Sequence, residues 1–266
     1  MKFKLDHDYH LHTNLSRCSK DPEQTPERLA AYALEEGLRE IVLTNHFWDD
    51  SYPGANNFYL TQNLEHIEQA LPLPAADGVK FYFGCEGEMR ADGLIGISPE
   101  HYDRFDFIII PTTHLHMNGF TIMEEDTSLP RRAVKYVERF ERLLSSDLPF
   151  RKVGVAHLTA GLIARDVPGD HFKVLEMIGD GTFRDLFRET ARVGMGVELN
   201  VPLLDPDSTE CEIILRPYRI ARECGCRFYL GSDAHSTEAL GRARARFERV
   251  TELLELTEED RFHPFG

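Results

Sequence analysis

Short apolar runs alternate along the chain with longer segments whose apolar residues recur at helical spacing. Each short run is typical of one buried strand, and each longer segment is typical of a helix with one face on a core. The predicted strands are 3–12, 41–43, 79–85, 105–110, 153–156, 196–200 and 228–230. The predicted helices are 25–37, 60–71, 127–144, 173–178, 183–193, 210–224 and 241–253. Strands that alternate with helices pair in parallel, so the pattern predicts an α/β sheet or barrel.

The helix at 25–37 has the clearest boundaries. Thr25 can cap its first turn, Pro26 suits its first position, and Gly37 ends it. Two other helices are predicted to bury a stripe of apolar side chains. The stripes consist of Leu60, Leu64, Ile67 and Leu71 in one helix and of Val134, Val137, Phe140 and Leu144 in the other. We expect both stripes to face the core.

Six of the predicted strands end in side chains that can bind metals. These side chains are His10, His12, His46, Glu86, His114, His157, Asp233 and His235. The carboxyl ends of parallel strands meet on one face of a sheet or barrel, so residues far apart in the chain come together there. Imidazole nitrogens and carboxylate oxygens are common ligands of divalent metals. The sequence therefore predicts a polynuclear metal site at this face.

The first and last of these motifs carry the most information. His10 and His12 stand two residues apart in a strand, so both point to the same side and can bind one cation. Two histidines that merely line a barrel would give the same spacing. Asp233 and His235 stand in the sequence GSDAH, whose small residues let the backbone approach a ligand cluster.

Two ligand positions have a competitor close by. Glu88 lies two residues after Glu86, and we prefer Glu86 as the carboxylate that could bridge two cations. His116 lies two residues after His114, which we prefer because it is nearer to the strand end. The other histidines are expected to be surface or packing residues; they are His7, His66, His101, His171 and His263.

Chain length and net charge limit the number of domains and the kinds of molecule that the protein is expected to bind. With 266 residues the chain suits one α/β barrel, and we expect a single domain over residues 1–266. The formal net charge of −15 would repel a nucleic-acid backbone over most of the surface, so extended nucleic acid is not an expected partner. An acidic chain with bound cations is better suited to a small substrate in a cleft.

The cysteines and the apolar runs indicate the compartment. Five cysteines are scattered along the chain with no disulfide framework, which favours a reducing compartment. No apolar run reaches the roughly 18 residues that a membrane span requires. The first residues enter a predicted strand almost at once and do not read as a signal peptide. We therefore expect a cytoplasmic protein with no membrane partner.

In their order along the chain, these motifs resemble the polymerase and histidinol phosphatase (PHP) superfamily. The matching pieces are DYHLHT with His10 and His12, TNH with His46, Glu86 after the third strand, His114 after the fourth, GVAH with His157, and GSDAH with Asp233 and His235. The combination is far more specific than any one piece. The resemblance implies a distorted TIM-like (β/α)7 barrel with a trinuclear metal centre.

The resemblance also implies a ligand set for two or three divalent ions of zinc, manganese or iron. The first ion would be held by His10, His12, Glu86 and Asp233, the second by Glu86, His114 and His157, and the third by His46 and His235. The family usually supplies one more ligand to the third ion, several residues after the HxH motif. Cys18 stands near that place here, and its thiolate would favour zinc or iron over manganese. Asp21 is the alternative.

The activity that the resemblance implies is hydrolysis of a phosphoester by a metal-activated water. The chain resembles free-standing histidinol phosphatases, so we expect a small phosphate monoester, with histidinol phosphate as the first guess. Glu86, Asp233 and His235 are expected to take part in catalysis. Glu198 is expected to orient a ligand histidine from outside the cluster.

Arginines in predicted loops at the mouth of the site are candidates for binding the phosphate. They are Arg17, Arg90 and Arg165.

Three other functions remain possible for this sequence. The family also includes nucleotide phosphodiesterases and exonucleases, and some relatives are non-catalytic modules. A TIM-like amidohydrolase also uses HxH and a late aspartate, but it commonly adds a carboxylated lysine after a middle strand, and this sequence has none at such an end.

Overall fold

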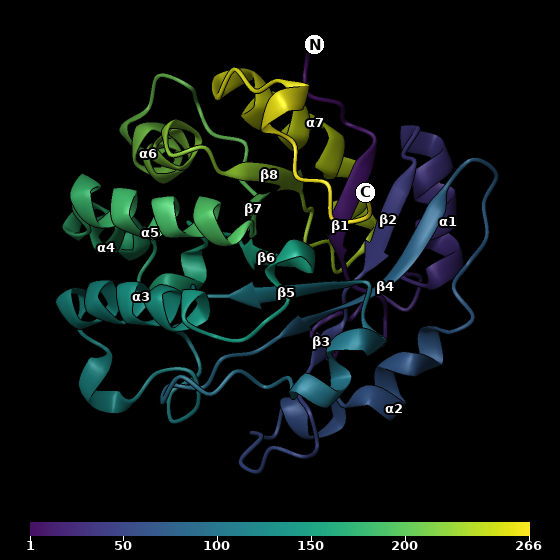
Figure 1. The fold of residues 1–266 in the computed structure, drawn as a ribbon, viewed down its shortest axis with the longest axis horizontal. Coiled ribbons are helices and arrows are strands. Elements are labelled where there is room, and N and C mark those ends of the chain that lie inside the picture. Colours follow the sequence, from purple (N-terminus) through teal and green to yellow (C-terminus); the bar gives the residue numbers. More distant parts are fainter.

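Eight strands form one parallel sheet that curves into a nearly closed barrel in the computed structural model, which describes residues 1–266 (Figure 1). The strands are β1 His7–Leu11, β2 Glu40–Leu43, β3 His46–Phe47, β4 Lys80–Gly87, β5 Phe107–Pro111, β6 Val153–Ala156, β7 Gly196–Leu199 and β8 Arg227–Leu230. β2 and β3 pair in succession with β4, so these two form one interrupted strand and the barrel has seven strand positions. The predicted (β/α)7 barrel is therefore confirmed.

The first and last strands meet at their carboxyl ends. Just after β8, the N–H of Asp233 donates to the carbonyl oxygen of His10 at 2.8 Å. The N–H of His12 donates to the carbonyl oxygen of Ala234 at 3.2 Å. Main-chain hydrogen bonds therefore hold the two most specific sequence motifs side by side.

Seven α-helices surround the strands (Figure 1). They are α1 Pro26–Glu36, α2 Leu64–Ile67, α3 Leu129–Leu144, α4 Asp170–Met177, α5 Asp180–Val193, α6 Thr209–Glu223 and α7 Thr237–Leu253. The boundaries of α1 are those predicted, because the Thr25 side chain accepts from the N–H of Arg28 and Gly37 follows with a left-handed φ of 66°. None of the helices combines the length and the apolar character that crossing a bilayer requires.

The single helix predicted at 60–71 is wrong. The segment forms two single turns of 3₁₀ helix on either side of the short α2. Leu60 and Leu71, which belong to the predicted apolar stripe, are 59% and 41% exposed. The Asn63 side chain accepts a hydrogen bond from the N–H of His66 and so caps the start of α2. The predicted helix would have to continue without a break through this residue.

α3 lies where predicted, but a different face is buried. Val134 is 42% exposed, whereas the side chains of Arg132 and Arg139 are 4% and 3% exposed. Both guanidinium groups donate to main-chain carbonyls of loops that follow the strands. A buried arginine is tolerated when its donors are paired in this way. The predicted inward stripe is therefore wrong at Val134, although Phe140 and Leu144 are buried.

The C-terminal residues fill the end of the barrel opposite the predicted ligands. Phe262 packs against Phe107 and Tyr229, which belong to a small buried cluster drawn from several strands. Phe265 stacks on Tyr82 near the start of β4, with ring centroids 3.6 Å apart. The amino ends of the strands are thus closed by the chain itself, and only the other end is left for a substrate.

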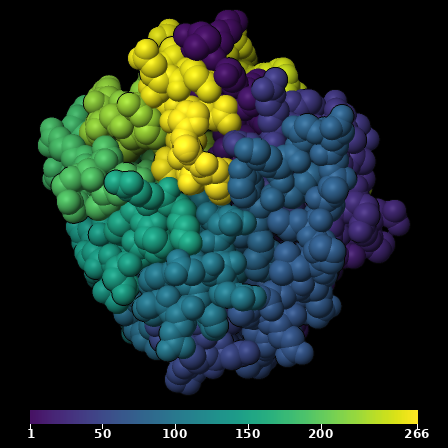
Figure 2. Space-filling view, turned by 45° about the vertical axis from the view of Figure 1, so that its right-hand side comes forward, coloured from purple at the N-terminus to yellow at the C-terminus, as the bar shows by residue number.

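β1 begins at His7, later than the predicted residue 3. Lys2 pairs with Thr257, and the N–H of Phe3 donates to the carbonyl oxygen of Leu256 at 3.4 Å. Figure 2 shows the two ends of the chain, purple and yellow, next to each other on one face. The residues before β1 therefore pair with the C-terminal segment instead of extending the strand.

Candidate metal centre

The carboxyl ends of the strands bring eight predicted ligand residues into one cluster. In three groups of these residues, the candidate ligand atoms all lie within 4.8 Å of one another. The groups are His10, His12, Glu86 and Asp233; Glu86, His114 and His157; and His12, His46 and His235. Because Glu86 and His12 each belong to two groups, the three groups form one continuous site.

The first group has the tightest geometry. His12 Nε2 lies 3.1 Å from His10 Nε2 and 3.1 Å from Asp233 Oδ1. Glu86 Oε2 lies 3.4 Å from His12 Nε2 and 3.6 Å from His10 Nε2. Two imidazoles from β1 and its end therefore face two carboxylates, one from β4 and one from the loop after β8.

Glu86 connects the first group with the second through its two oxygens. While Oε2 faces His10 and His12, Oε1 lies 3.3 Å from His157 Nε2 and 3.8 Å from His114 Nε2. A carboxylate placed in this way can bridge two cations. His116 is in none of the groups, so the structure brings His114 rather than its competitor to the cluster.

The third group contains His12 in addition to the two histidines predicted for it. The rings of His12 and His235 stack with centroids 4.0 Å apart, and His46 Nδ1 lies 2.8 Å from Glu86 Oε2. Cys18 lines a cavity that opens over the cluster but is in none of the three groups. Burial raises the pKa of the Cys18 thiol, but the nearby His46 and His235 outweigh burial and lower it to about 6. A readily ionised thiol thus lies beside the third group.

Asp21, the alternative to Cys18, lies elsewhere. Its Oδ2 accepts hydrogen bonds from the N–H of Thr237 at 2.9 Å and from the Thr237 hydroxyl at 2.8 Å. It belongs to none of the groups and does not line the cavity. The structure therefore places Asp21 at the start of α7 and not among the candidate ligands.

Two buried polar atoms of the cluster have no hydrogen-bond partner. They are Glu86 Oε2 and His46 Nδ1, which lie 2.8 Å apart but without the angles that a hydrogen bond requires. A buried polar atom without a partner costs free energy, and such atoms are few in folded proteins. A bound cation would satisfy both atoms. A set of imidazoles and carboxylates suits zinc, manganese or iron, so the residues present fit the metals that the sequence predicts.

Burial opposes the charged forms of Glu86, Asp233, His10 and His46, yet these acidic and basic groups stabilise each other. Neighbouring histidines hold the pKa of Glu86 and of Asp233 well below the usual range. Neighbouring acidic groups raise the pKa of His10 and of His46 well above the usual range. A metal ion must displace protons from these imidazoles, so metal affinity is expected to fall as the pH is lowered.

Further contacts fix the orientation of the histidines. Glu198 Oε1 lies 2.6 Å from His10 Nδ1, and its Oε2 accepts from the N–H of His157 at 2.5 Å. His157 Nδ1 lies 2.7 Å from the Thr113 hydroxyl, and His12 Nδ1 lies 2.9 Å from the Ser16 hydroxyl. Such contacts leave Nε2 free to face a metal. Glu198 thus makes the predicted contact, while no sequence pattern indicates the two hydroxyls.

Glu88, the alternative to Glu86, contacts residues outside the three groups as well as one candidate ligand. Its Oε2 lies 2.7 Å from His114 Nδ1 and accepts from the Tyr59 hydroxyl at 3.1 Å. Its Oε1 lies 3.2 Å from Arg139 Nη2. Glu88 therefore lies behind a candidate ligand and belongs to none of the three groups. Sequence reasoning missed Arg139, because α3 was oriented by its apolar residues alone.

Gly231 lets the end of β8 approach this cluster. A Cβ atom there would lie 2.0 Å from Glu198 Oε1 and 2.8 Å from His10 Cβ. Gly231→Ala must therefore displace the carboxylate that holds His10. We expect the variant to bind Zn²⁺ about 10- to 100-fold more weakly, the range typical for loss of a contact that supports a ligand. Isothermal titration calorimetry would measure this affinity.

Gly241→Ala is the matched control for this variant. A Cβ atom at Gly241, in α7, would meet no atom within 4 Å. Its Zn²⁺ affinity should be unchanged, and the helix should gain about 0.5–1 kcal/mol of stability. Unchanged Zn²⁺ affinity in Gly231→Ala would contradict the role that we give to Glu198.

A cavity of about 540 Å³ opens over the cluster. It is lined by Cys18, His46, Asn56, Phe58, Tyr59, Glu86, His114, His116, Met117, Leu162, Arg165, Asp233 and His235. Its volume lies within the roughly 300–1,000 Å³ typical of small-molecule sites. The cluster is therefore open to a small substrate.

Of the three arginines predicted to bind phosphate, the structure brings one to this cavity. Arg165 lines it and makes no hydrogen bond or ion pair within the chain. The Arg17 side chain donates to the carbonyl oxygen of Asn57, and Arg90 Nε donates to Asp92 Oδ1 at 2.9 Å. Neither Arg17 nor Arg90 lines the cavity.

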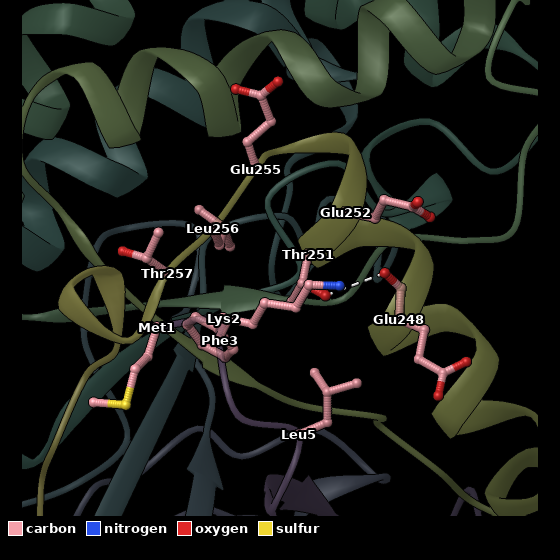
Figure 3. A pocket seen from close by; sticks show the side chains of 10 residues that line it. All are labelled: Met1, Lys2, Phe3, Leu5, Glu248, Thr251, Glu252, Glu255, Leu256 and Thr257. Carbon is pink, nitrogen blue, oxygen red and sulfur yellow. Dashed lines mark hydrogen bonds between the residues drawn. The ribbon is translucent and has the colours of Figure 1, made fainter.

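A second cavity, of about 700 Å³, lies between residues 1–5 and the end of α7 (Figure 3). Its acidic residues are Glu248, Glu252 and Glu255, and Figure 3 shows their carboxylates pointing in different directions. No histidine or cysteine lines it. This cavity gathers no set of side chains suited to metal binding or to attack on a substrate.

Comparisons with known proteins agree with this fold. A family model described as PHP-associated matches residues 216–260. Among solved structures, histidinol phosphate phosphatase from Lactococcus lactis, complexed with zinc, L-histidinol and phosphate, is similar with a TM-score of 0.60 and 18% identity over 92% of this chain and 93% of that one. No curated protein sequence matches the chain.

Another similar structure is a probable 2-pyrone-4,6-dicarboxylic acid hydrolase from Acinetobacter baumannii. It has a TM-score of 0.42 and 14% identity over 95% of this chain and 96% of that one. This likeness is too weak to carry an argument about function.

The barrel is shared with the Lactococcus structure, and the cluster at the carboxyl ends of its strands gathers side chains that could hold metal ions. The PHP-associated match over residues 216–260 agrees with the resemblance to the PHP superfamily, and the Lactococcus structure shares the barrel fold.

Proposed function

We propose that this protein hydrolyses a small phosphate monoester at a di- or trinuclear metal site. The placement of Glu86 supports this most directly, because its two oxygens face two different groups of histidines. Divalent ions bound there would lower the pKa of a water and neutralise charge on the phosphate. No serine or cysteine nucleophile is required.

Five members of the groups also line the cavity and so have a direct path to a substrate; they are His46, Glu86, His114, Asp233 and His235. Of these, we propose that Glu86, Asp233 and His235 take part in catalysis. Glu86 and Asp233 supply negative charge that keeps cations in the site. Cys18 also lines the cavity, and we propose that it completes the third metal position beside His46 and His235.

Arg165 is proposed to bind the phosphate. Its guanidinium group has no partner within the chain and lies on the cavity wall, so it is free to pair with an anion. Arg165→Met should lower kcat/KM for a phosphate monoester by about 10- to 100-fold, mainly through KM, as expected for loss of a charge-assisted hydrogen bond. Steady-state kinetics and competition by inorganic phosphate would measure the change.

Arg90→Met is the control for this prediction. Arg90 is a predicted loop arginine whose guanidinium group already pairs with Asp92, outside the cavity. Its kinetics should match those of the unmodified protein. Equal effects of the two substitutions, or no effect of Arg165→Met on KM, would remove Arg165 from the phosphate site.

The proposed reaction does not identify the alcohol that leaves the phosphate. The Lactococcus structure contains L-histidinol and phosphate, so histidinol phosphate is the first monoester to test.

We also propose that the protein works in the cytoplasm on a phosphorylated metabolite. The five cysteines, none of which is in a disulfide, support a reducing compartment.

Elemental analysis combined with a panel of phosphoesters tests this proposal. The purified protein should hold two or three zinc, manganese or iron ions and release phosphate from monoesters. Cleavage of a dinucleotide or a nucleoside bisphosphate in place of monoesters would favour the phosphodiesterase or exonuclease alternative. A metal-free protein that hydrolyses nothing would favour a non-catalytic module.

A further inference from the structure

The wall of the cavity outside the metal groups carries no carboxylate. Apart from Cys18, the proposed ligand of the third metal, its residues there are Asn56, Phe58, Tyr59, His116, Met117, Leu162 and Arg165. The only carboxylates that line the cavity are Glu86 and Asp233, and both belong to the proposed ligand set. A substrate in this cavity would therefore find no free anion beside its alcohol part.

The electrostatics of the cavity disfavour a cationic leaving group. Arg165 places an unpaired positive charge on the wall, and divalent ions at the cluster would add more. An ammonium group brought into this space would lose water without gaining an ion pair, which costs binding free energy. Histidinol carries such an ammonium group, so the cavity is poorly suited to it.

The same wall suits an apolar or aromatic group. The half-buried ring of Phe58 packs edge-on against His46 and Tyr59, with ring centroids 5.3 and 4.9 Å away. Met117 and Leu162 add apolar surface. These side chains offer contact to a flat or apolar molecule and no fixed anion.

Asn56, a polar residue of this wall, is engaged by its own loop. Its Oδ1 accepts from the N–H groups of Phe58 and Tyr59, both at 3.0 Å. Its Nδ2 donates to the sulfur of Met117 at 3.5 Å. The side chain thus fixes the loop that carries the aromatic residues.

We propose that the substrate is a phosphate monoester whose alcohol part is uncharged and carries an aromatic or apolar group. This inference rests on the proposed phosphatase activity and narrows its substrate class. This substrate class excludes amino alcohol phosphates. Their hydrolysis would use the same chemistry at the metal cluster, so only the alcohol part of the substrate differs.

A matched pair of substrates tests the proposal on the metal-loaded protein. Benzyl phosphate and para-(aminomethyl)benzyl phosphate differ by one cationic group while their leaving oxygens are closely similar. We expect kcat/KM to be roughly tenfold higher for benzyl phosphate, and histidinol phosphate to be a poor substrate. Equal or better hydrolysis of the two amines would overturn the substrate class and leave the phosphatase activity standing.

Asn56→Asp adds the missing carboxylate to the wall. Aspartate keeps an oxygen that can accept from the N–H groups of Phe58 and Tyr59, so the loop should keep its shape. The variant should shift the ratio of the two kcat/KM values about fivefold to tenfold toward the amine. Asn57→Asp is the control, because the exposed Asn57 carries the same change one residue outside the cavity and should leave the ratio unchanged.

The outcomes separate the two proposals. An unchanged ratio in Asn56→Asp, or an equal shift in Asn57→Asp, would overturn the inference about the cavity wall. Failure to hydrolyse any monoester would overturn the proposed function and this inference with it.

Discussion

Replacing His12 by alanine is expected to abolish hydrolysis and to remove more than one metal ion from the protein. His12 belongs to two of the three groups, since its Nε2 lies 3.1 Å from Asp233 Oδ1 and its ring stacks on His235 at 4.0 Å. Loss of a contact that merely supports a ligand costs about 10- to 100-fold in metal affinity or activity. Loss of a ligand shared by two groups should therefore cost kcat at least on the order of 1,000-fold, or about 4 kcal/mol.

Two measurements separate a lost metal from a lost fold. Elemental analysis should show fewer ions in His12→Ala than in the unmodified protein, while circular dichroism should show the same secondary structure. His171→Ala is the control, because His171 stands on α4 next to Phe172 and belongs to none of the groups. Full metal content and full activity in His12→Ala would show that the cluster is not the metal centre.

The sequence predicted those parts of the fold that depend on short-range patterns. Each predicted strand has a counterpart in the barrel, and the caps of α1 at Thr25 and Gly37 are where their residue types require. The gathering of His10 and Asp233 to within 3.4 Å follows from one rule about where parallel strands end. A strand pattern together with that rule places the candidate ligands near one another without any knowledge of side-chain geometry.

Features that depend on contacts between distant loops could not be predicted in this way. The break in the helix near Leu60 depends on the Asn63 side chain, which competes with the helix for a backbone N–H. The inward face of α3 depends on carbonyl groups of loops that the pattern does not place. An arginine is expected at the surface unless its partners are known, and so Arg132 and Arg139 were overlooked.

In the site, too, the sequence pattern predicts which residue types gather, but contacts between distant loops decide which of two neighbouring candidates joins the cluster. Cys18 and Asp21 both stand at plausible sequence positions, but only the structure shows that Asp21 is bound to Thr237. Glu86 and Glu88 are equally good ligands by type. They differ because Glu86 faces the histidine nitrogens of the cluster, whereas Glu88 faces Arg139 and the far side of His114.

Arg139 is therefore expected to matter almost as much as a ligand, although it does not line the cavity. Its guanidinium group donates to Glu88 Oε1 at 3.2 Å and to the carbonyl oxygens of Met89 at 2.7 Å and Thr112 at 3.0 Å. Glu88 in turn holds His114 Nδ1 at 2.7 Å. The chain of contacts runs from α3 through the ends of β4 and β5 to a candidate ligand of the second group.

Arg139→Met should lower both stability and metal binding. The substitution leaves the buried Glu88 without its cationic partner, and breaking one side of a buried ion pair typically costs about 3–5 kcal/mol. Burial raises the pKa of Glu88, while His114 and Arg139 lower it, so loss of Arg139 moves that pKa upward. With His114 less firmly held, the affinity for one metal ion should fall about 10- to 100-fold. Chemical denaturation and calorimetric titration with Zn²⁺ would measure the two effects.

Two further variants distinguish positioning of a ligand from general stability. Arg131→Met, on the same helix, removes a half-exposed guanidinium group from the buried Asp126, which also lies 3.5 Å from Lys135 Nζ. This variant should lose some stability but bind Zn²⁺ as tightly as the unmodified protein. Adding Glu88→Gln to Arg139→Met removes the unpaired buried charge and should restore part of the stability. If Zn²⁺ affinity in the double variant stays low, the pair positions His114 as argued. If Arg139→Met loses stability but binds every metal ion as tightly as before, the ion pair only holds the barrel together and His114 is oriented by other contacts.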